Sequence, residues 1–164
     1  MKNSTLITIL FITLASCSEK KVKYASFEEF PTPTKTNLWL DYSKTGTTFK
    51  LWSPNAEEVK INLYKNGTDG NPFENYQMAA TQDGLWEKHI DGDLNGTYYT
   101  YQVKIDGKWL QETPGIYAQA VGVNGQRAMI LDLESTNPTD WNNDKGPKVT
   151  TPNDAIIYER NPIS

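Results

Sequence analysis

Apolar and polar residues alternate along most of the chain between Leu38 and Leu133, and this period of two constrains the fold more than any other feature. Successive side chains of a β-strand point to opposite faces, so the alternation places the apolar residues on one side of a sheet. Turn residues such as Gly, Asn, Asp and Pro separate the alternating segments. These segments are TTFKLWSP (47–54), EVKINLYK (58–65), GLWEKHI (84–90), TYYTYQVKI (97–105) and RAMILDL (127–133). No amphipathic helix accompanies them, so the pattern predicts an all-β fold, an immunoglobulin-like (early-set) β-sandwich.

Size and charge narrow the range of functions. A chain of 164 residues holds one domain of ordinary size with short flanking segments. The net charge is −4 and there is no long basic run, which argues against a nucleic-acid partner. His89 is the only histidine, so a zinc cluster or a Ser-His-Asp arrangement lacks members, and we predict no metal and no cofactor.

The first residues are typical of a targeting segment rather than of the fold. Lys2 precedes an apolar run at 6–14, which suits a signal peptide and is too short for a permanent membrane span. The run ends in Leu-Ala-Ser-Cys17, which resembles the bacterial lipobox, where the cysteine is acylated. We therefore expect a signal peptide at 1–16, a lipid-anchored tether at 17–36, and attachment to a membrane through Cys17 as an outer-membrane lipoprotein of the bacterial cell envelope. Ordinary secretion, with Cys17 merely near the cleavage site, is the alternative.

One turn sets side-chain directions more firmly than the others. Asp106-Gly107 is a strong signal for a two-residue hairpin, because both central positions of the tight primed turn need positive φ. Ile105 then faces Lys108, and one step along the ladder Lys104 pairs with Trp109. Facing residues share a side of the sheet, so Trp109 is predicted to lie on the polar side and to be at least partly exposed.

An exposed indole beside hydrogen-bonding groups is suited to holding sugars. The C–H faces of a pyranose ring stack on the indole of Trp109, while the neighbouring Gln102 amide and Lys104 ammonium bond the ring hydroxyls. Packing at the end of the sandwich is the equally simple alternative for Trp109. Trp52 and Trp86 are predicted to belong to the core instead.

The segments TTFKLWSPNAEEVKINLYKNG, YYTYQVKIDGKW, ETPGIYAQAVGVNGQRAMILDL and TNPTDW together resemble the N-terminal part of type I pullulanases, debranching enzymes of glycoside hydrolase family 13. The resemblance implies that residues 37–134 form a family 48 carbohydrate-binding module and that 135–152 are a linker. It also implies that 153–164 begin the first strand of the catalytic (β/α)₈ barrel.

The resemblance also implies a binding site for an α-glucan such as pullulan, glycogen or starch. In glycogen-binding members a Trp after an Asp-Gly turn stacks on the glucan, and that position here is Trp109. Those members have Lys where this chain has Gln102, whose neutral amide still bonds hydroxyls. Lys104 and Asn124 complete the predicted carbohydrate contacts. A module that only packs against the barrel, without sugar affinity, is the alternative, because the second stacking Trp of such binders has no match here.

The last residues depart from the family. After Glu159 the family continues with a His-x-Arg-Asp-Phe type of sequence, whereas this chain reads RNPIS, and Pro162 does not suit a central strand. The two catalytic carboxylates of a retaining glycosidase lie on later barrel strands. From the residues present we expect a truncated product with no catalytic residues and no hydrolase activity.

Overall fold

The computed structural model describes residues 24–33, 37–146, 148, 150, 151, 153 and 156. Its nine strands and the lack of an α-helix among the described residues agree with the predicted all-β class. None of the helical turns in this part of the chain has the length and apolar character needed to cross a membrane. The expected signal peptide, Cys17 and most of the expected barrel strand lie outside the described residues, so these stay predictions.

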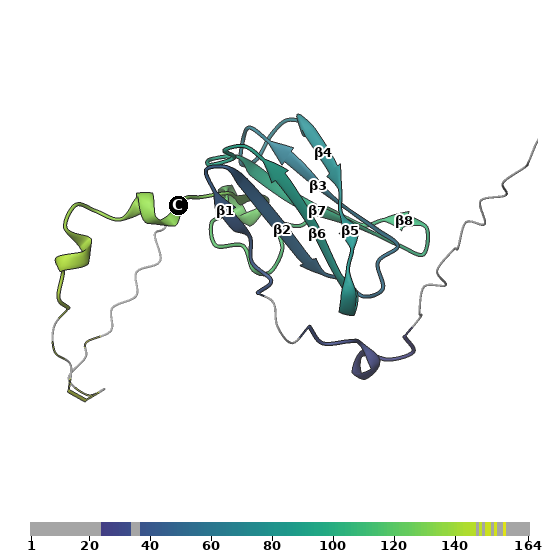
Figure 1. The fold of residues 1–164 in the computed structure, drawn as a ribbon, viewed down its shortest axis with the longest axis horizontal. Coiled ribbons are helices and arrows are strands. Elements are labelled where there is room, and N and C mark those ends of the chain that lie inside the picture. Colours follow the sequence, from purple (N-terminus) through teal and green to yellow (C-terminus); the bar gives the residue numbers. More distant parts are fainter. Residues whose placement is uncertain are drawn as a thin grey trace, which may run out of the picture.

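Two antiparallel sheets form the two layers of the molecule (Figure 1). The first sheet has the order β1-β2-β6-β5, and β2 and β6 pair along their whole length, from Gly46 opposite Asp91 to Trp52 opposite Leu85. Its strands are β1 (Asp41–Ser43), β2 (Gly46–Trp52), β5 (Ala79–Ala80) and β6 (Leu85–Asp91).

The second sheet has the order β4-β3-β7-β8, and β9 joins it by pairing with β7. Its strands are β3 (Glu58–Tyr64), β4 (Glu74–Gln77), β7 (Tyr98–Ile105), β8 (Lys108–Trp109) and β9 (Ala128–Met129). One edge of β7 is covered in succession by β8, by a bridge between Tyr101 and Thr113, and by β9. The chain after the hairpin therefore runs back along β7. Short 3₁₀ turns complete the structure, namely η1 (Phe27–Glu29), η2 (Gln82–Gly84), η3 (Val123–Gly125), η4 (Leu133–Thr136) and η5 (Trp141–Asn143).

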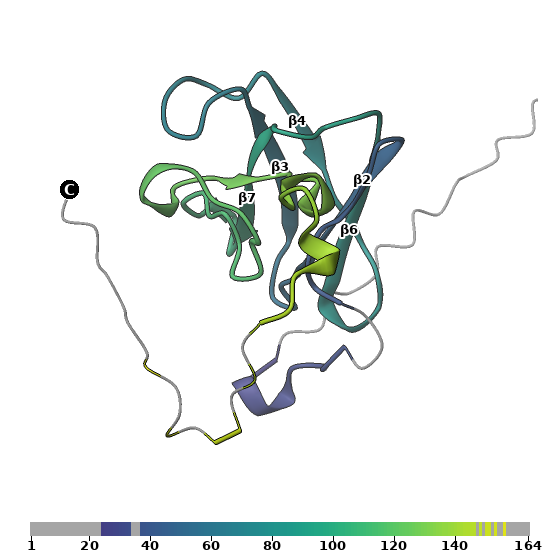
Figure 2. The same cartoon turned by 90° about the vertical axis from the view of Figure 1, so that its left-hand side faces the viewer.

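The core lies between the two sheets, where the predicted apolar faces meet (Figure 2). Phe49 of β2 is fully buried and meets Tyr99 of β7 edge-to-face, with ring centroids 5.2 Å apart. Trp86 is buried as predicted, and its indole N–H donates to the Ser53 carbonyl at 3.0 Å. The other main members of this cluster are Val59, Ile61, Leu63, Ile90, Tyr101, Ala128 and Ile130. Every alternating segment of the sequence contributes to this cluster, so the period-two interpretation is confirmed.

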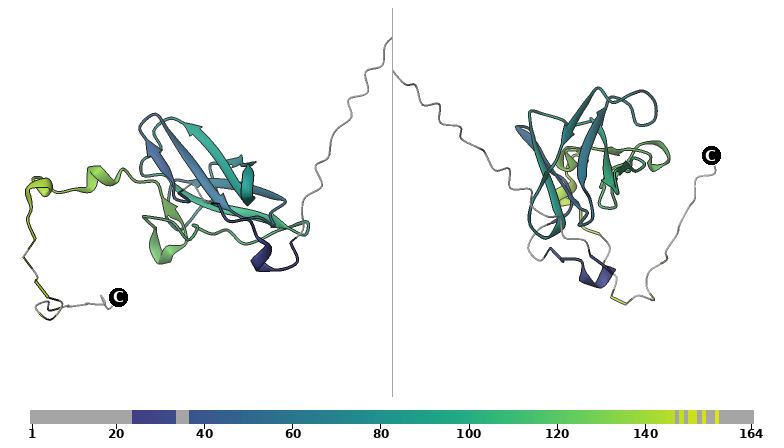
Figure 3. Two further views of the ribbon diagram at one scale, coloured as in Figure 1. Left: turned by 60° about the horizontal axis from the view of Figure 1, so that its bottom comes forward. Right: turned by 90° about the vertical axis from the view of Figure 1, so that its right-hand side faces the viewer.

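The described part of the predicted tether, residues 24–33, contacts the sandwich (Figure 3). Trp52 is half-buried, and its indole N–H donates to the carbonyls of Pro31 and Asp83, both at 3.1 Å. The rings of Phe27 and Phe30 meet Trp52 edge-on, with centroids 6.5 Å and 6.0 Å from its own. This aromatic cluster fixes where the N-terminal segment meets the domain.

Candidate functional site

The hairpin between β7 and β8 has the predicted register. Lys104 pairs with Trp109 and Ile105 pairs with Lys108. Asp106 and Gly107 have φ values of 48° and 74°, the left-handed conformation that a primed two-residue turn requires. The backbone N–H of Gly107 also donates to a carboxylate oxygen of Glu57 at 3.1 Å, which ties the turn to the start of β3. The hairpin is thereby held against the neighbouring strand.

Trp109 lies on the outer face of the second sheet and is 37% exposed. Two ammonium groups approach its ring. The Lys60 Nζ lies 4.6 Å from the ring centroid, and the Lys104 Nζ lies 6.0 Å from it. A cation near an indole face is attracted by the negative charge of the π-system. The predicted neighbour Lys104 is therefore present, and Lys60 joins it from β3.

The two predicted polar neighbours of Trp109 both have partners inside the protein. Lys104 Nζ contacts Glu58 Oε1 at 2.7 Å, and this hydrogen bond raises the pKa of Lys104. The Gln102 side-chain amide donates to the Leu110 carbonyl at 2.9 Å. Gln102 thus helps to hold the residue that follows Trp109, and its carbonyl oxygen is the atom left to accept from a ligand.

The opposite end of the same outer face is closed. The Glu112 carboxylate accepts hydrogen bonds from the Thr100 hydroxyl, at 2.7 Å, and from the Tyr64 hydroxyl. Burial, and after it the bond to Glu112, raises the pKa of Tyr64. Thr100 and Tyr64 are both buried, although the alternation of the sequence assigns them to the polar side. The segment after the hairpin therefore covers this end of the face and leaves the end at Trp109 open.

Arg127 anchors the loops at this closed end. Its guanidinium lies 3.5 Å from the centroid of the Tyr64 ring. The same group donates to three carbonyls of one loop, those of Asn66 at 2.7 Å, Asp69 at 2.9 Å and Gly70 at 2.9 Å. The arginine satisfies oxygens that the turn itself leaves without partners, so it fixes the loop between β3 and β4.

Asn124 lies within η3, is exposed, and has a φ of 55°. The preceding turn residue, Gly122, packs so closely on Gly67 that a Cβ at Gly122 would come within 2.9 Å of the Gly67 Cα. Gly122 also lies against the Tyr98 ring, six residues along β7 from Lys104, about 20 Å at the strand rise. The loop of Asn124 thus belongs to the closed end. Trp109, Gln102 and Lys104 are brought together at the other end.

Two residues near this sheet were missed by the sequence interpretation, the half-buried Lys60 and the exposed Phe73. Lys60 reaches Trp109 because β3 pairs with β7 and sets Lys60 opposite Gln102. Phe73 is 49% exposed and precedes the edge strand β4. The alternation of EVKINLYK assigns Lys60 to the polar face, but nothing local says which strand lies beside it.

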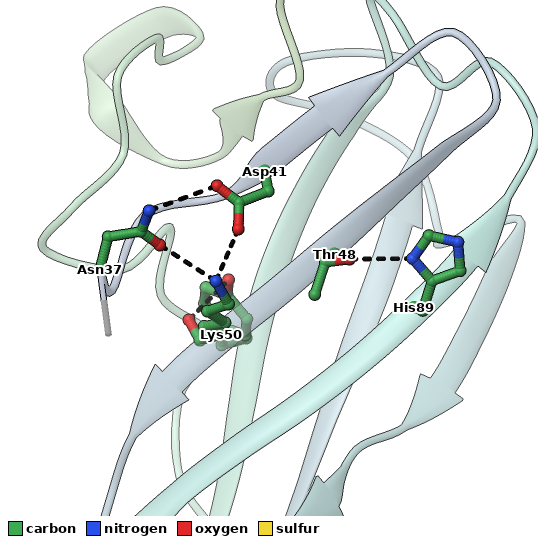
Figure 4. Close-up of polar contacts among 6 residues, drawn as sticks. Asn37, Asp41, Thr48, Lys50 and His89 are labelled. Atoms are coloured by element: carbon green, nitrogen blue, oxygen red, sulfur yellow. Dashed lines mark hydrogen bonds and ion pairs between the residues drawn. The ribbon is translucent and has the colours of Figure 1, made fainter. Parts of the chain in front are cut away.

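The outer face of the first sheet carries a different set of contacts (Figure 4). Lys50 Nζ bonds Asp41 Oδ2 at 2.6 Å and Asn37 Oδ1 at 3.0 Å. Between β2 and β6 the Thr48 hydroxyl bonds His89 Nδ1 at 2.8 Å. These polar side chains satisfy one another within the protein. Within the described residues no group of three or more His, Cys, Asp or Glu side chains is arranged to hold a metal ion.

Two similar solved structures are pullulanases. A crystal structure of pullulanase from Paenibacillus barengoltzii, in complex with maltohexaose and alpha-cyclodextrin, superposes with a TM-score of 0.74 at 40% identity. The match covers 82% of this chain and 21% of that one. A pullulanase from Bacillus acidopullulyticus matches with a TM-score of 0.66 at 33% identity, over 71% of this chain and 14% of its own.

Sequence comparisons give the same relatives. The pullulanase of Bacillus subtilis is 31% identical over 118 residues, which are 72% of this chain and 15% of that protein. A 1,4-alpha-glucan branching enzyme of Nitrosomonas europaea is 30% identical over 106 residues, 63% of this chain and 14% of that enzyme. The chain thus spans about one seventh of the length of these relatives.

Residues 37–125 match the family model described as carbohydrate-binding module 48 (isoamylase N-terminal domain). This range contains both sheets up to the loop of Asn124, including the hairpin that presents Trp109. The chain therefore belongs to the carbohydrate-binding module 48 family, in the form found in pullulanase-type enzymes.

Proposed function

We propose that this domain binds α-glucan chains on the open end of its second sheet, as the non-catalytic module of a pullulanase-type debranching enzyme. The observation that carries the proposal is Trp109, an exposed indole held rigidly by a hairpin and approached by two ammonium groups. A glucose ring stacks its C–H face on such an indole, and ammonium and amide groups bond its hydroxyls. The maltohexaose and cyclodextrin in the Paenibacillus barengoltzii complex belong to that protein, and they support the choice of ligand class here.

The proposal is tested by electrophoresis of the full chain in gels that contain glycogen or pullulan. We expect glucan to retard the wild-type protein and Trp109→Ala to abolish the retardation, because the substitution removes the stacking surface. Trp39→Ala is the matched control, since Trp39 is also exposed, at 46%, but lies away from the hairpin. Equal mobility of the wild type with and without glucan would refute binding.

Packing against another domain is a second candidate function, and one observation favours it. An apolar groove of about 150 Å³ lies between β2 and residues 114–118. Trp39, Tyr117 and Ile116 line it, and Ile116 is 91% exposed. Exposed apolar surface of this kind is typical of an interaction site. A protein that is not retarded by glucan would leave packing as the better-supported function.

A further inference from the structure

The polar groups around Trp109 differ in how far their hydrogen-bonding capacity is already used. Lys104 is held by Glu58 at 2.7 Å, so a ligand has to compete with that carboxylate for its ammonium. The Gln102 amide nitrogen already donates to the Leu110 carbonyl. Some of the N–H donors of Lys104 and Gln102 are therefore already used in hydrogen bonds within the protein.

Lys60 is the exception. Within the part of the chain that the structure describes, the only interaction of its ammonium is with the Trp109 ring, 4.6 Å from the centroid. No carboxylate of the described residues forms an ion pair with it. An ammonium has three N–H donors, and an aromatic face replaces none of them with a true hydrogen bond. The Lys60 ammonium thus lies over the Trp109 ring with its charged N–H donors not committed to any protein oxygen of the described residues.

The sheet register explains why Lys60 is in this position. Lys60 faces Gln102 across β3 and β7, so their side chains leave the sheet on the same face, about 5 Å apart at the Cβ atoms. The diagonal neighbour of Lys60 on β7 is Lys104, which pairs with Trp109. Because β7 lies between β3 and β8 in the sheet, the long lysine stem crosses β7 to bring its ammonium to the indole.

We infer that Lys60 is the principal charged donor of this site, the group that bonds adjacent hydroxyls of a glucose ring stacked on Trp109. The inference rests on the proposed function, because it names a further contact in the same site. A single ammonium with free donors bridges two neighbouring hydroxyl oxygens, whereas the committed Gln102 amide and the paired Lys104 contribute less. Charge-assisted hydrogen bonds are about twice as strong as neutral ones, so the effect of losing Lys60 exceeds that of losing Gln102.

The test is a titration of the full chain with maltoheptaose, followed by the fluorescence of its tryptophans, and repeated for single variants. We expect Lys60→Met to weaken binding about tenfold, the effect of one charge-assisted hydrogen bond at a partly exposed site. Lys60→Arg keeps a charged donor and stays within about threefold of the wild type. Lys88→Met is the matched control, because Lys88 also lies over an aromatic ring, that of Tyr76 at 5.4 Å, but outside this site.

A double variant separates a binding role from a merely structural one. Lys60→Met combined with Gln102→Lys moves the ammonium to the facing position on β7, and we expect it to recover most of the lost affinity. Binding by Lys60→Met that equals or exceeds the wild type, while Trp109→Ala still abolishes binding, would overturn the inference alone. An absence of binding by the wild-type protein would instead refute the proposed function. Thermal unfolding of each variant checks that the fold is intact.

Discussion

The outer faces of the two sheets are built from similar residues but use them differently. On the first sheet Lys50 bonds Asp41 and Asn37, and Thr48 bonds His89, so the polar groups satisfy each other (Figure 4). On the second sheet Lys60 has only the Trp109 ring as a partner among the described residues. Residue type alone does not distinguish Lys50 from Lys60. Their different partners are consistent with the proposed function, in which the first face is structural and the open end of the second face binds the glucan.

A second contrast lies within the second sheet itself. At the end near Trp109 the outer face is open, whereas at the other end Glu112 and Arg127 cover Thr100 and Tyr64. Polar side chains that the sequence places outside are buried there because a later segment of the chain folds over them. Each half of the face is therefore expected to respond to substitution in a different way, stability at one end and affinity at the other.

The largest expected effect is at the closed end. Arg127→Met removes the donors to three loop carbonyls and the contact with the Tyr64 ring. We expect the free energy of unfolding to fall by about 3 kcal/mol, the size associated with breaking a buried hydrogen-bond network. Urea titration followed by tryptophan fluorescence measures it. Lys65→Met, on the exposed part of the same loop, is the control. A loss below about 1 kcal/mol for Arg127→Met would show that the arginine does not anchor the loop.

A buried phenol on the inner face of the second sheet, that of Tyr99, is expected to make the folded protein less stable at alkaline pH. Burial raises the pKa of Tyr99 from 10.0 to about 12. The unfolded chain loses this proton near pH 10 and the folded one near pH 12, so the contribution to stability is complete below pH 10 and lost as the pH rises toward 12. Two pKa units correspond to between about 2 and 3 kcal/mol.

Urea unfolding at about pH 9 and about pH 12 tests this, and Tyr99→Phe should show the smaller loss between the two conditions. Tyr42→Phe is the comparison from the first sheet. The pKa of Tyr42 is also raised to about 12, chiefly by its hydrogen bond to Asp93, but this phenol lies at the surface. If the wild type and Tyr99→Phe lost the same free energy of unfolding between these two pH values, the Tyr99 phenol would not be the cause of the alkaline loss of stability.

The smallest expected effect sharpens the comparison of the two outer faces. Lys50→Met removes an ammonium with two protein partners and should reduce the free energy of unfolding by about 1 kcal/mol, without changing glucan affinity. Lys60→Met is expected to do the opposite, with little change in stability and a loss of affinity. Parallel urea and maltoheptaose titrations measure both quantities. If Lys50→Met weakened glucan binding as much as Lys60→Met, the distinction between the faces would be lost.

Much of the fold was predictable because it depends on local chemistry. The alternation of EVKINLYK and TYYTYQVKI predicted which residues enter the core, and Val59, Ile61 and Tyr101 are buried. The Asp106-Gly107 pair predicted the register that sets Trp109 beside Lys104. Both predictions need only the two-residue period of a strand and the φ preference of a turn.

Sequence alone was therefore enough to specify the all-β class, the faces of the strands, and the hairpin that presents Trp109. The tertiary structure alone decided that β3 pairs with β7, about 40 residues later, and that Lys60 reaches the indole. It also decided that Glu112 and Arg127 close the far end of the same face. The physical reason is that alternation specifies which side of a sheet a residue occupies, whereas its neighbour there depends on which strands pair and how later loops return.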